Sequence, residues 1–224
     1  MSLNNYFGGW SKIIDAEELS KINTWLSSVD RTLLCPSINK VFRAFQLCPY
    51  DKCKIVILSQ DPYPQKDIAQ GLAFANSETT TSLSPSLEII KESVINFEIP
   101  HYSYTFDITL GSWAEQGILL LNSALTCELN KPGSHTQIWT PFMSKLVSNL
   151  SKEKPMLIWV LMGNQAKMYE RYIKGSYIFK CNHPSFYART GIKLPHKLWL
   201  DINEKCYDVF KEKIIWYEEF KELF

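Results

Sequence analysis

Three polar side chains follow strand-like runs of this sequence, and each is of a type that does chemistry in proteins. Asp61 and Asn122 each follow a short run rich in Ile, Leu and Val, and His183 follows the run Tyr177–Cys181. A carboxylate serves as a base or an anion, an imidazole moves or donates a proton, and an amide reads a pattern of donors and acceptors. Short apolar runs are typical of parallel strands, whose carboxyl ends form the ligand-binding edge of open α/β sheets. We therefore expect the three side chains to share a pocket.

Each of the three residues also has an ordinary structural interpretation when it is taken alone. Asp61 precedes Pro62 and His183 precedes Pro184, and both pairs are common in turns. Asn122 is equally suited to closing a turn after a strand. Only their joint placement, each after a strand-like run, favours a functional site.

Apolar periodicity and turn residues place these runs between helices. Helices are predicted over 15–29, 38–47, 85–97, 108–116, 139–150, 163–173 and 195–207, and strands over 54–59, 118–121, 155–162 and 176–181. Asp15 and Ser84 are predicted N-caps, and Pro141 is predicted in the first turn of its helix. The tail to Phe224 is predicted to be a further helix or an edge strand.

The alternation of strands and helices predicts the fold class. It implies a parallel sheet that is covered by helices on both faces. We predict an α/β protein, a single-domain α/β/α sandwich around a four-stranded parallel sheet. A length of 224 residues is enough for one sizeable core, and no repeat or linker divides the chain. The domain is therefore predicted to span 1–224.

Composition narrows the class of protein and its location. The net charge of +1 does not itself indicate a polyanion partner, although a local basic groove stays open. The 6 cysteines form no Cys-x-x-Cys pair and have no zinc-site spacing, which is typical of reduced thiols in an intracellular protein. No secretion signal and no bilayer-spanning run is evident. We expect a cytoplasmic protein, or a nuclear one in a eukaryotic host, without a metal, a cofactor or a membrane partner.

Five short segments, in order and at compatible spacing, resemble motifs of the family 1 uracil-DNA glycosylases. Residues 59–65, Ser-Gln-Asp-Pro-Tyr-Pro-Gln, are similar to the family's water-activating motif GQDPYHG. The other matches are 70–75 to HGLAFS, 85–88 to the proline-rich loop, 119–122 to LLLN and 183–188 to HPSPLS. The resemblance covers about 50–210 of the chain.

The resemblance implies a DNA repair glycosylase of base excision repair, which hydrolyses the N-glycosidic bond of a flipped-out deoxyuridine and leaves an abasic site. It implies that Asp61 stabilises the cation-like sugar and orients or deprotonates the attacking water. It also implies that a neutral His183 donates a hydrogen bond to the negative charge that develops on uracil.

The resemblance assigns four further residues to uracil. Asn122 would pair with N3–H and O4, a pattern that cytosine reverses. Phe74 would stack on the base, although ordinary core packing is the usual use of a Phe. Tyr63 would lie beside C5 and clash with the methyl group of thymine. Gln60 would contribute backbone donors.

Contacts with DNA are expected at the mouth of the site. The residues assigned to them are Ser86, Gly163, Asn164, Ser185, Tyr187 and Arg189. The hydroxyls and the Gly163-Asn164 turn suit phosphate oxygens. Tyr187 stands where the family has a leucine that wedges into the base stack, and an aromatic ring also fills such a hole. Arg189, like Lys167 and Lys193, is either a groove cation or a solvated surface charge.

Several positions depart from the family's pattern. Pro64 and Gln70 replace histidines, Asn164 replaces the serine of a Gly-Ser loop, and Phe186 precedes the unusual Tyr187. None of these changes removes the acid, the imidazole or the amide, so we expect an active enzyme.

Three other functions stay open at this stage. An inactive homologue would bind DNA as a scaffold, and a related glycosylase would choose a different base. A small-molecule-binding doubly wound domain is disfavoured, because no glycine-rich phosphate motif is present. For the favoured function the expected partner is uracil-containing DNA, single- or double-stranded, and a protein inhibitor that mimics DNA is a further partner to consider. The protein is expected to be a monomer.

Overall fold

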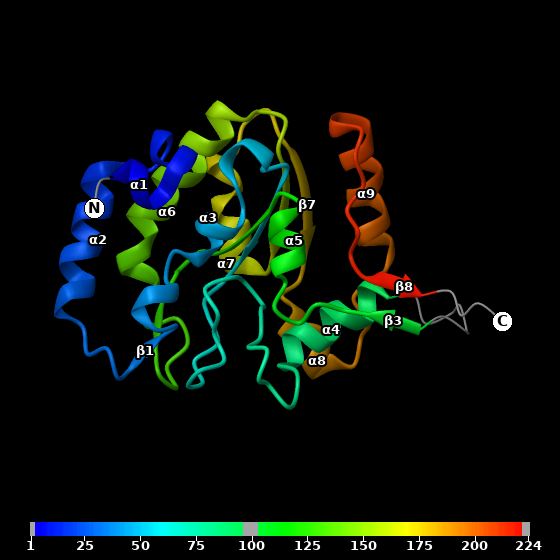
Figure 1. Cartoon of the computed structure of the whole chain (residues 1–224), viewed down its shortest axis with the longest axis horizontal. Coiled ribbons are helices and arrows are strands. Elements are labelled where there is room, and N and C mark those ends of the chain that lie inside the picture. The colour runs from blue at the N-terminus through cyan, green and yellow to red at the C-terminus, as the bar shows by residue number, and fades with distance from the viewer. Residues whose placement is uncertain (1–2, 96–102, 221–224) are drawn as a thin grey trace.

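A four-stranded parallel sheet forms the centre of the protein (Figure 1). The computed structural model describes residues 3–95 and 103–220. The sheet has the order β4–β2–β6–β7, and its strands are β2 (Ile55–Ser59), β4 (Ile118–Asn122), β6 (Ile158–Met162) and β7 (Tyr177–Cys181). Every residue of β2, β4 and β6 is buried, as expected for continuous apolar runs covered on both faces. The predicted fold class is confirmed.

The register of the sheet brings the carboxyl ends of the strands to one edge. Ser59 of β2 is paired with Asn122 of β4, and Met162 of β6 with Cys181 of β7. The chain passes from β2 to β4 on one side and then crosses to β6 on the other, so the strand order reverses next to β2. In open α/β sheets ligands bind outside the carboxyl ends at such a reversal.

Helices cover the sheet on two sides. In Figure 1, α2 (Ala16–Ser28) and α6 (Thr136–Glu153) lie to the left of the sheet and α9 (Lys197–Phe210) lies to its right. Asp15 caps α2 as predicted, because its side chain accepts a hydrogen bond from the Glu18 N–H at 2.9 Å. Shorter helices are α1 (Leu3–Phe7), α3 (Arg43–Leu47), α5 (Gly111–Glu115) and α7 (Asn164–Lys167).

Two helices meet near the carboxyl edge of the sheet. These are α4 (Pro85–Val94) and α8 (Pro184–Thr190), and both begin with a proline at a position whose N–H has no partner within a helix. The sequence interpretation treated 183–188 as a motif and missed α8. The end of the predicted helix 85–97 also lies beyond Val94, with residues 96 and 97 outside the described residues.

Other helix predictions need correction. The predicted helix 38–47 is divided into a 3-10 turn, Ile38–Lys40, and α3, and the predicted helix 163–173 into α7 and a 3-10 turn, Met168–Tyr172. Because α6 begins at Thr136, Pro141 lies inside the helix and not in its first turn. Ser84 precedes α4 but does not cap it, since its hydroxyl donates to Oδ1 of Asn76 at 2.8 Å.

The C-terminal part of the described chain is held by a small sheet and an aromatic cluster. The strand β8 (Glu218–Phe220) pairs antiparallel with β3 (Ser103–Thr105), so the last described residues form an edge strand. Beside it, the rings of Trp113, Trp199 and Trp216 lie 4.8 to 5.7 Å apart between centroids. The indole N–H of Trp113 donates to the Trp216 carbonyl at 2.9 Å. A second small sheet pairs β1 (Leu34–Cys35) with β5 (Cys127–Glu128).

Among the helices of residues 3–95 and 103–220, none is both long and apolar enough to cross a lipid bilayer.

Candidate active site

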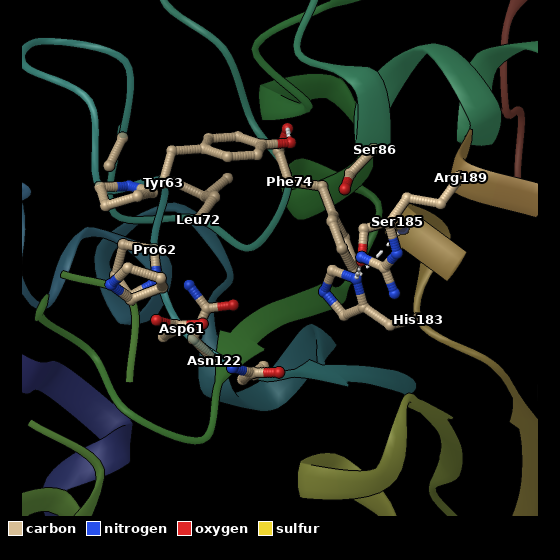
Figure 2. Close-up of a pocket in the computed structure, with 14 residues that line it drawn as sticks. Asp61, Pro62, Tyr63, Leu72, Phe74, Ser86, Asn122, His183, Ser185 and Arg189 are labelled. Atoms are coloured by element: carbon tan, nitrogen blue, oxygen red, sulfur yellow. Dashed lines mark hydrogen bonds between the residues drawn. The ribbon is translucent and has the colours of Figure 1, made fainter. Parts of the chain in front are cut away.

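A cavity of about 340 Å³ opens at the carboxyl edge of the sheet (Figure 2). Its lining consists of Gln60, Asp61, Pro62, Tyr63, Pro64, Ala69, Leu72, Phe74, Ser86, Asn122, Pro132, His183, Ser185 and Arg189. Nine of the residues singled out from the sequence are therefore brought together. Of the twelve residues that the resemblance assigned to catalysis, uracil or DNA, the three that do not line the cavity are Gly163, Asn164 and Tyr187.

Asp61 stands just beyond the end of β2. The backbone N–H of Gly133 donates a hydrogen bond to its Oδ2. Burial raises the pKa of the Asp61 carboxyl above its ordinary value, while the Gly133 N–H and the Gln60 amide oppose that shift. Figure 2 shows Asp61 and Asn122 on one side of the cavity, and His183, Ser185 and Arg189 on the other.

His183 is the N-cap residue of α8, and its neighbours define where its proton lies. The backbone N–H of Ser185 donates to Nδ1 of His183 at 3.2 Å, so Nδ1 is the unprotonated nitrogen of a neutral ring. Nε2 then carries the proton and donates to Oγ of Ser59 at 3.2 Å. Burial, with a contribution from the Arg189 charge, lowers the pKa of His183 to about 4. At neutral pH the ring is thus an uncharged donor through Nε2.

Gly163 packs against His183. A Cβ at this glycine would lie 2.8 Å from Cβ of His183, and its φ of +93° is one that other residues rarely adopt. The glycine therefore leaves room for the imidazole. Asn164 is exposed at the start of α7. A phosphate contact by this pair stays a prediction.

Tyr63 and Phe74 are joined by a hydrogen bond. The Tyr63 hydroxyl donates to the carbonyl of Phe74 at 3.0 Å, and burial raises the pKa of Tyr63, which keeps it a neutral donor. Phe74 has a φ of +68°, an unusual conformation for a bulky residue. Its ring centroid lies 5.6 Å from that of His183, with 51° between the ring planes. The two aromatic residues form one fixed wall.

Asn122 presents a buried amide to the cavity. The residue is only 6% exposed, and its side chain has no hydrogen-bond partner among residues 3–95 and 103–220. Buried polar groups are normally paired, and an unpaired one in a cavity is ready for a ligand. Ser86 lies near the start of α4, is 5% exposed and also lines the cavity.

Tyr187, the residue expected to act as a wedge, is buried in this structure. It is 7% exposed and packs against Phe186, with 5.4 Å between the ring centroids. Because the segment is helical, the side chain is turned inward and lines a second cavity between α4 and the segment after α8. The ring is therefore buried in this structure, which holds no DNA, and the wedge role of Tyr187 stays a prediction. Lys193 also lines this second cavity, and neither Lys193 nor Lys167 lines the site.

The sequence interpretation missed three residues that shape the site. Ser59 contacts His183, Gly133 contacts Asp61, and Pro132 lines the cavity. The Pro-Gly pair at 132–133 was visible as a turn signal, but its distance along the chain from Asp61 hides the contact. Ser59, the last residue of β2, carried no signal beyond its place in the motif.

Gln70 and Pro64, which stand where the family has histidines, both make contacts near the site. The side-chain oxygen of Gln70 accepts from Lys40 at 2.7 Å, and its amide nitrogen donates to the carbonyls of Asp67 and Ile68. Gln70 thus fixes the loop that leads to Phe74. Pro64 lines the cavity, and its carbonyl accepts from the Asn130 N–H at 2.8 Å.

Across the described ranges 3–95 and 103–220, no group of three or more His, Cys, Asp and Glu side chains is arranged to hold a metal ion.

Known proteins with similar sequences include uracil-DNA glycosylases. The model of the uracil DNA glycosylase superfamily matches residues 45–206. A uracil-DNA glycosylase of Campylobacter jejuni is 39% identical over 196 residues, which cover 86% of this chain and 83% of the relative. One from Francisella tularensis subsp. novicida is 32% identical over 220 residues, covering 92% and 97%.

Solved structures with a similar fold include uracil-DNA glycosylases. A mimivirus UNG variant in complex with UGI superposes with a TM-score of 0.74 at 26% identity, covering 89% of this chain and 81% of that chain. A mimivirus uracil-DNA glycosylase gives a TM-score of 0.72 at 23% identity, covering 96% and 91%, and supports the fold. The sequence matches span most of this chain, and the cavity stands where the motifs converge. The chain therefore belongs to the uracil DNA glycosylase superfamily.

Proposed function

We propose that this chain releases uracil from DNA by hydrolysing the N-glycosidic bond of an extruded deoxyuridine, with Asp61 and His183 in the chemical step. The observation that carries the proposal is a neutral His183 whose Nε2–H lies in the same cavity as the Asp61 carboxylate. The superfamily membership supports the same reaction.

The two residues match the charges that develop as the bond breaks. Positive charge grows on the sugar, and the Asp61 carboxylate stabilises it and orients the attacking water. Negative charge grows on the leaving base, and the Nε2–H of His183 donates to it without carrying a charge that would be costly to bury. The Gly133 N–H holds the carboxylate in place and favours its ionised form.

Base choice is assigned to the walls of the cavity. The unpaired amide of Asn122 offers an acceptor to uracil N3–H and a donor to O4, and cytosine reverses both. Phe74 stacks on the base, and Tyr63 excludes a methyl group at C5 because its hydroxyl is fixed on the Phe74 carbonyl. Gln60 lines the cavity beside Asp61 and contributes to the same recognition.

DNA binding is assigned to the mouth of the cavity. Ser86, Ser185 and Arg189 line it and suit phosphate oxygens, and Asn164 is exposed nearby on α7. The partner is uracil-containing DNA, single- or double-stranded. Because one relative was solved in complex with UGI, a protein inhibitor that covers this mouth is part of the proposal.

The chain is proposed to work as one domain and one copy, since all the assigned residues come from a single chain. The cytoplasm is the proposed location, because the described cysteines are all free thiols, which is typical of a reducing compartment.

The test is release of uracil from a single-stranded oligonucleotide. Asp61→Asn should lower the rate by about 10²–10⁴-fold while DNA binding, measured by fluorescence anisotropy, changes little. Asp51→Asn, which removes an exposed carboxylate outside the cavity, is the matched control and should retain full activity. No release by the wild-type protein would refute the function, and equal rates in Asp61→Asn would remove Asp61 from the mechanism.

A further inference from the structure

A hydrogen-bonded line connects the mouth of the cavity to the imidazole of His183. Nη1 of Arg189 donates to Oγ of Ser185 at 3.1 Å, and Oγ of Ser185 lies 2.9 Å from Nδ1 of His183. On the far side of the ring, Nε2 contacts Ser59. Figure 2 shows Arg189, Ser185 and His183 next to one another at one side of the cavity.

The donor and the acceptor of each hydrogen bond in this chain of contacts can be assigned from the groups involved. A guanidinium only donates, so it occupies one lone pair of the Ser185 hydroxyl and leaves the hydroxyl proton for Nδ1 of His183, which is an acceptor. The Ser185 backbone N–H donates to the same nitrogen at 3.2 Å. Two donors aimed at Nδ1 disfavour a proton there. Protonation of Nδ1 would remove the acceptor of the Ser185 N–H and force the Ser185 hydroxyl to turn its proton away, beside the positive charge of Arg189.

We propose that Arg189 is a positioning residue for the glycosidic step, which acts through Ser185 to hold His183 neutral with its proton on Nε2. This role is additional to a contact with DNA phosphate. It rests on the proposed function, in which the Nε2–H of His183 is the donor to the leaving base. The influence of the Arg189 charge on the lowered pKa of His183 is in the same sense.

Other charged groups near His183 do not provide this effect. The loop after β2 contributes Asp61 and Tyr63 to the same cavity. Lys167 of α7 does not line it, and its charge acts on Cys181. A carboxylate favours protonation of the ring, so Asp61 acts in the opposite sense to Arg189. Arg189 is the only cation that lines the cavity among the described residues.

The direct experiment titrates His183 in the free protein, without DNA. Imidazole ¹⁵N and ¹H signals are followed from pH 8 down to the lowest pH at which circular dichroism shows a folded protein. In Arg189→Gln the pKa of His183 should rise by about half a unit or more, because a like charge and one hydrogen bond are lost. The shift in the wild type should shrink at high salt, since Arg189 is exposed.

Matched variants separate charge from structure. Arg189→Lys retains the charge and should titrate close to the wild type. Arg171→Gln removes an exposed arginine that lies on the 3-10 turn after α7 and does not line the cavity, and it should leave the titration of His183 unchanged. In a Ser185→Ala background, Arg189→Gln should have a smaller effect than in the wild type, because the link is already broken.

Uracil release supplies the functional readout. In Arg189→Gln the acid side of the kcat profile should move to higher pH by about the same half unit, so the loss of kcat relative to the wild type should reach about twofold near pH 4 and disappear toward pH 8. The inference is overturned if His183 keeps its pKa and tautomer in Arg189→Gln and only KM and its salt dependence change. Because the titration needs no substrate, it decides this inference even if the protein releases no uracil.

Discussion

The imidazole of His183 is held as a neutral hydrogen-bond donor before a substrate binds. Its two nitrogens have separate partners, Ser185 on Nδ1 and Ser59 on Nε2, so the ring has one tautomer and one orientation. A fixed donor of this kind stabilises developing negative charge without reorganisation, which is typically worth about 10²–10³-fold in rate. Because the ring is held neutral, the pH dependence of uracil release can be predicted.

The kcat for uracil release should stay level from pH 8 through pH 6 and fall only in the acid range. The pKa of His183 is lowered to about 4, so the ring does not gain a charge near the ordinary value of 6.5. The pKa of Asp61 is raised, and activity is lost as the pH falls through that value because the carboxylate becomes protonated. Steady-state rates across pH 4–8 check this. A fall centred near pH 6.5 would show that His183 titrates as a free imidazole.

Tyr63 offers a test of base choice at the scale of a single ring. Tyr63→Ala should permit release of thymine, since it removes the group that meets a C5 methyl. Tyr63→Phe retains the ring but loses the hydrogen bond to the Phe74 carbonyl, so it should still reject thymine. It should lose about 1 kcal/mol of stability. Chromatography of the released bases and thermal unfolding measure these outcomes. Rejection of thymine by Tyr63→Ala would count against the steric role.

The turn between β6 and α7 positions His183 from the side, and a glycine is essential to it. Gly163→Ala should lower kcat by more than tenfold, because a Cβ 2.8 Å from Cβ of His183 forces the imidazole to move. Destabilisation of about 1–3 kcal/mol should accompany it. Rates and thermal unfolding are measured on the same variant.

Gly175→Ala is the control for backbone strain in that experiment. Gly175 also has a positive φ, +67°, but an added Cβ would meet only Pro155, at an ordinary 3.6 Å. It should lose stability without a comparable loss of kcat. Equal kcat losses in both variants would mean that strain, and not the contact with His183, explains the effect.

Elements that depend on local pattern were predictable from the sequence. The strand-like runs before Asp61 and Asn122 identify β2 and β4, and parallel pairing then places both side chains at one edge. The burial of Tyr187 was not predictable from the motif, because it depends on the helical turn of α8. The contact of Gly133 with Asp61 joins residues 72 positions apart, and no local signal reports such a contact.

At the scale of the whole molecule, burial of the thiols suggests a chemical test of the native state. Among the 6 cysteines all but Cys181 are buried, and burial raises the pKa of Cys181 to about 12. Thiols react as thiolates, so the folded protein should react slowly with a disulfide reagent and all cysteines should react after unfolding. A colorimetric thiol assay with and without denaturant measures this. Rapid reaction of several thiols in the native protein would contradict the burial.

The three tryptophans beside β8 have a practical consequence. Indole rings 4.8 to 5.7 Å apart are close enough for their electronic transitions to couple, and Trp216 lies only two residues before β8. Detachment of the C-terminal segment would separate one chromophore from the other two. The ultraviolet circular dichroism of the unlabelled protein thus contains an intrinsic spectroscopic reporter of whether its last described strand is docked.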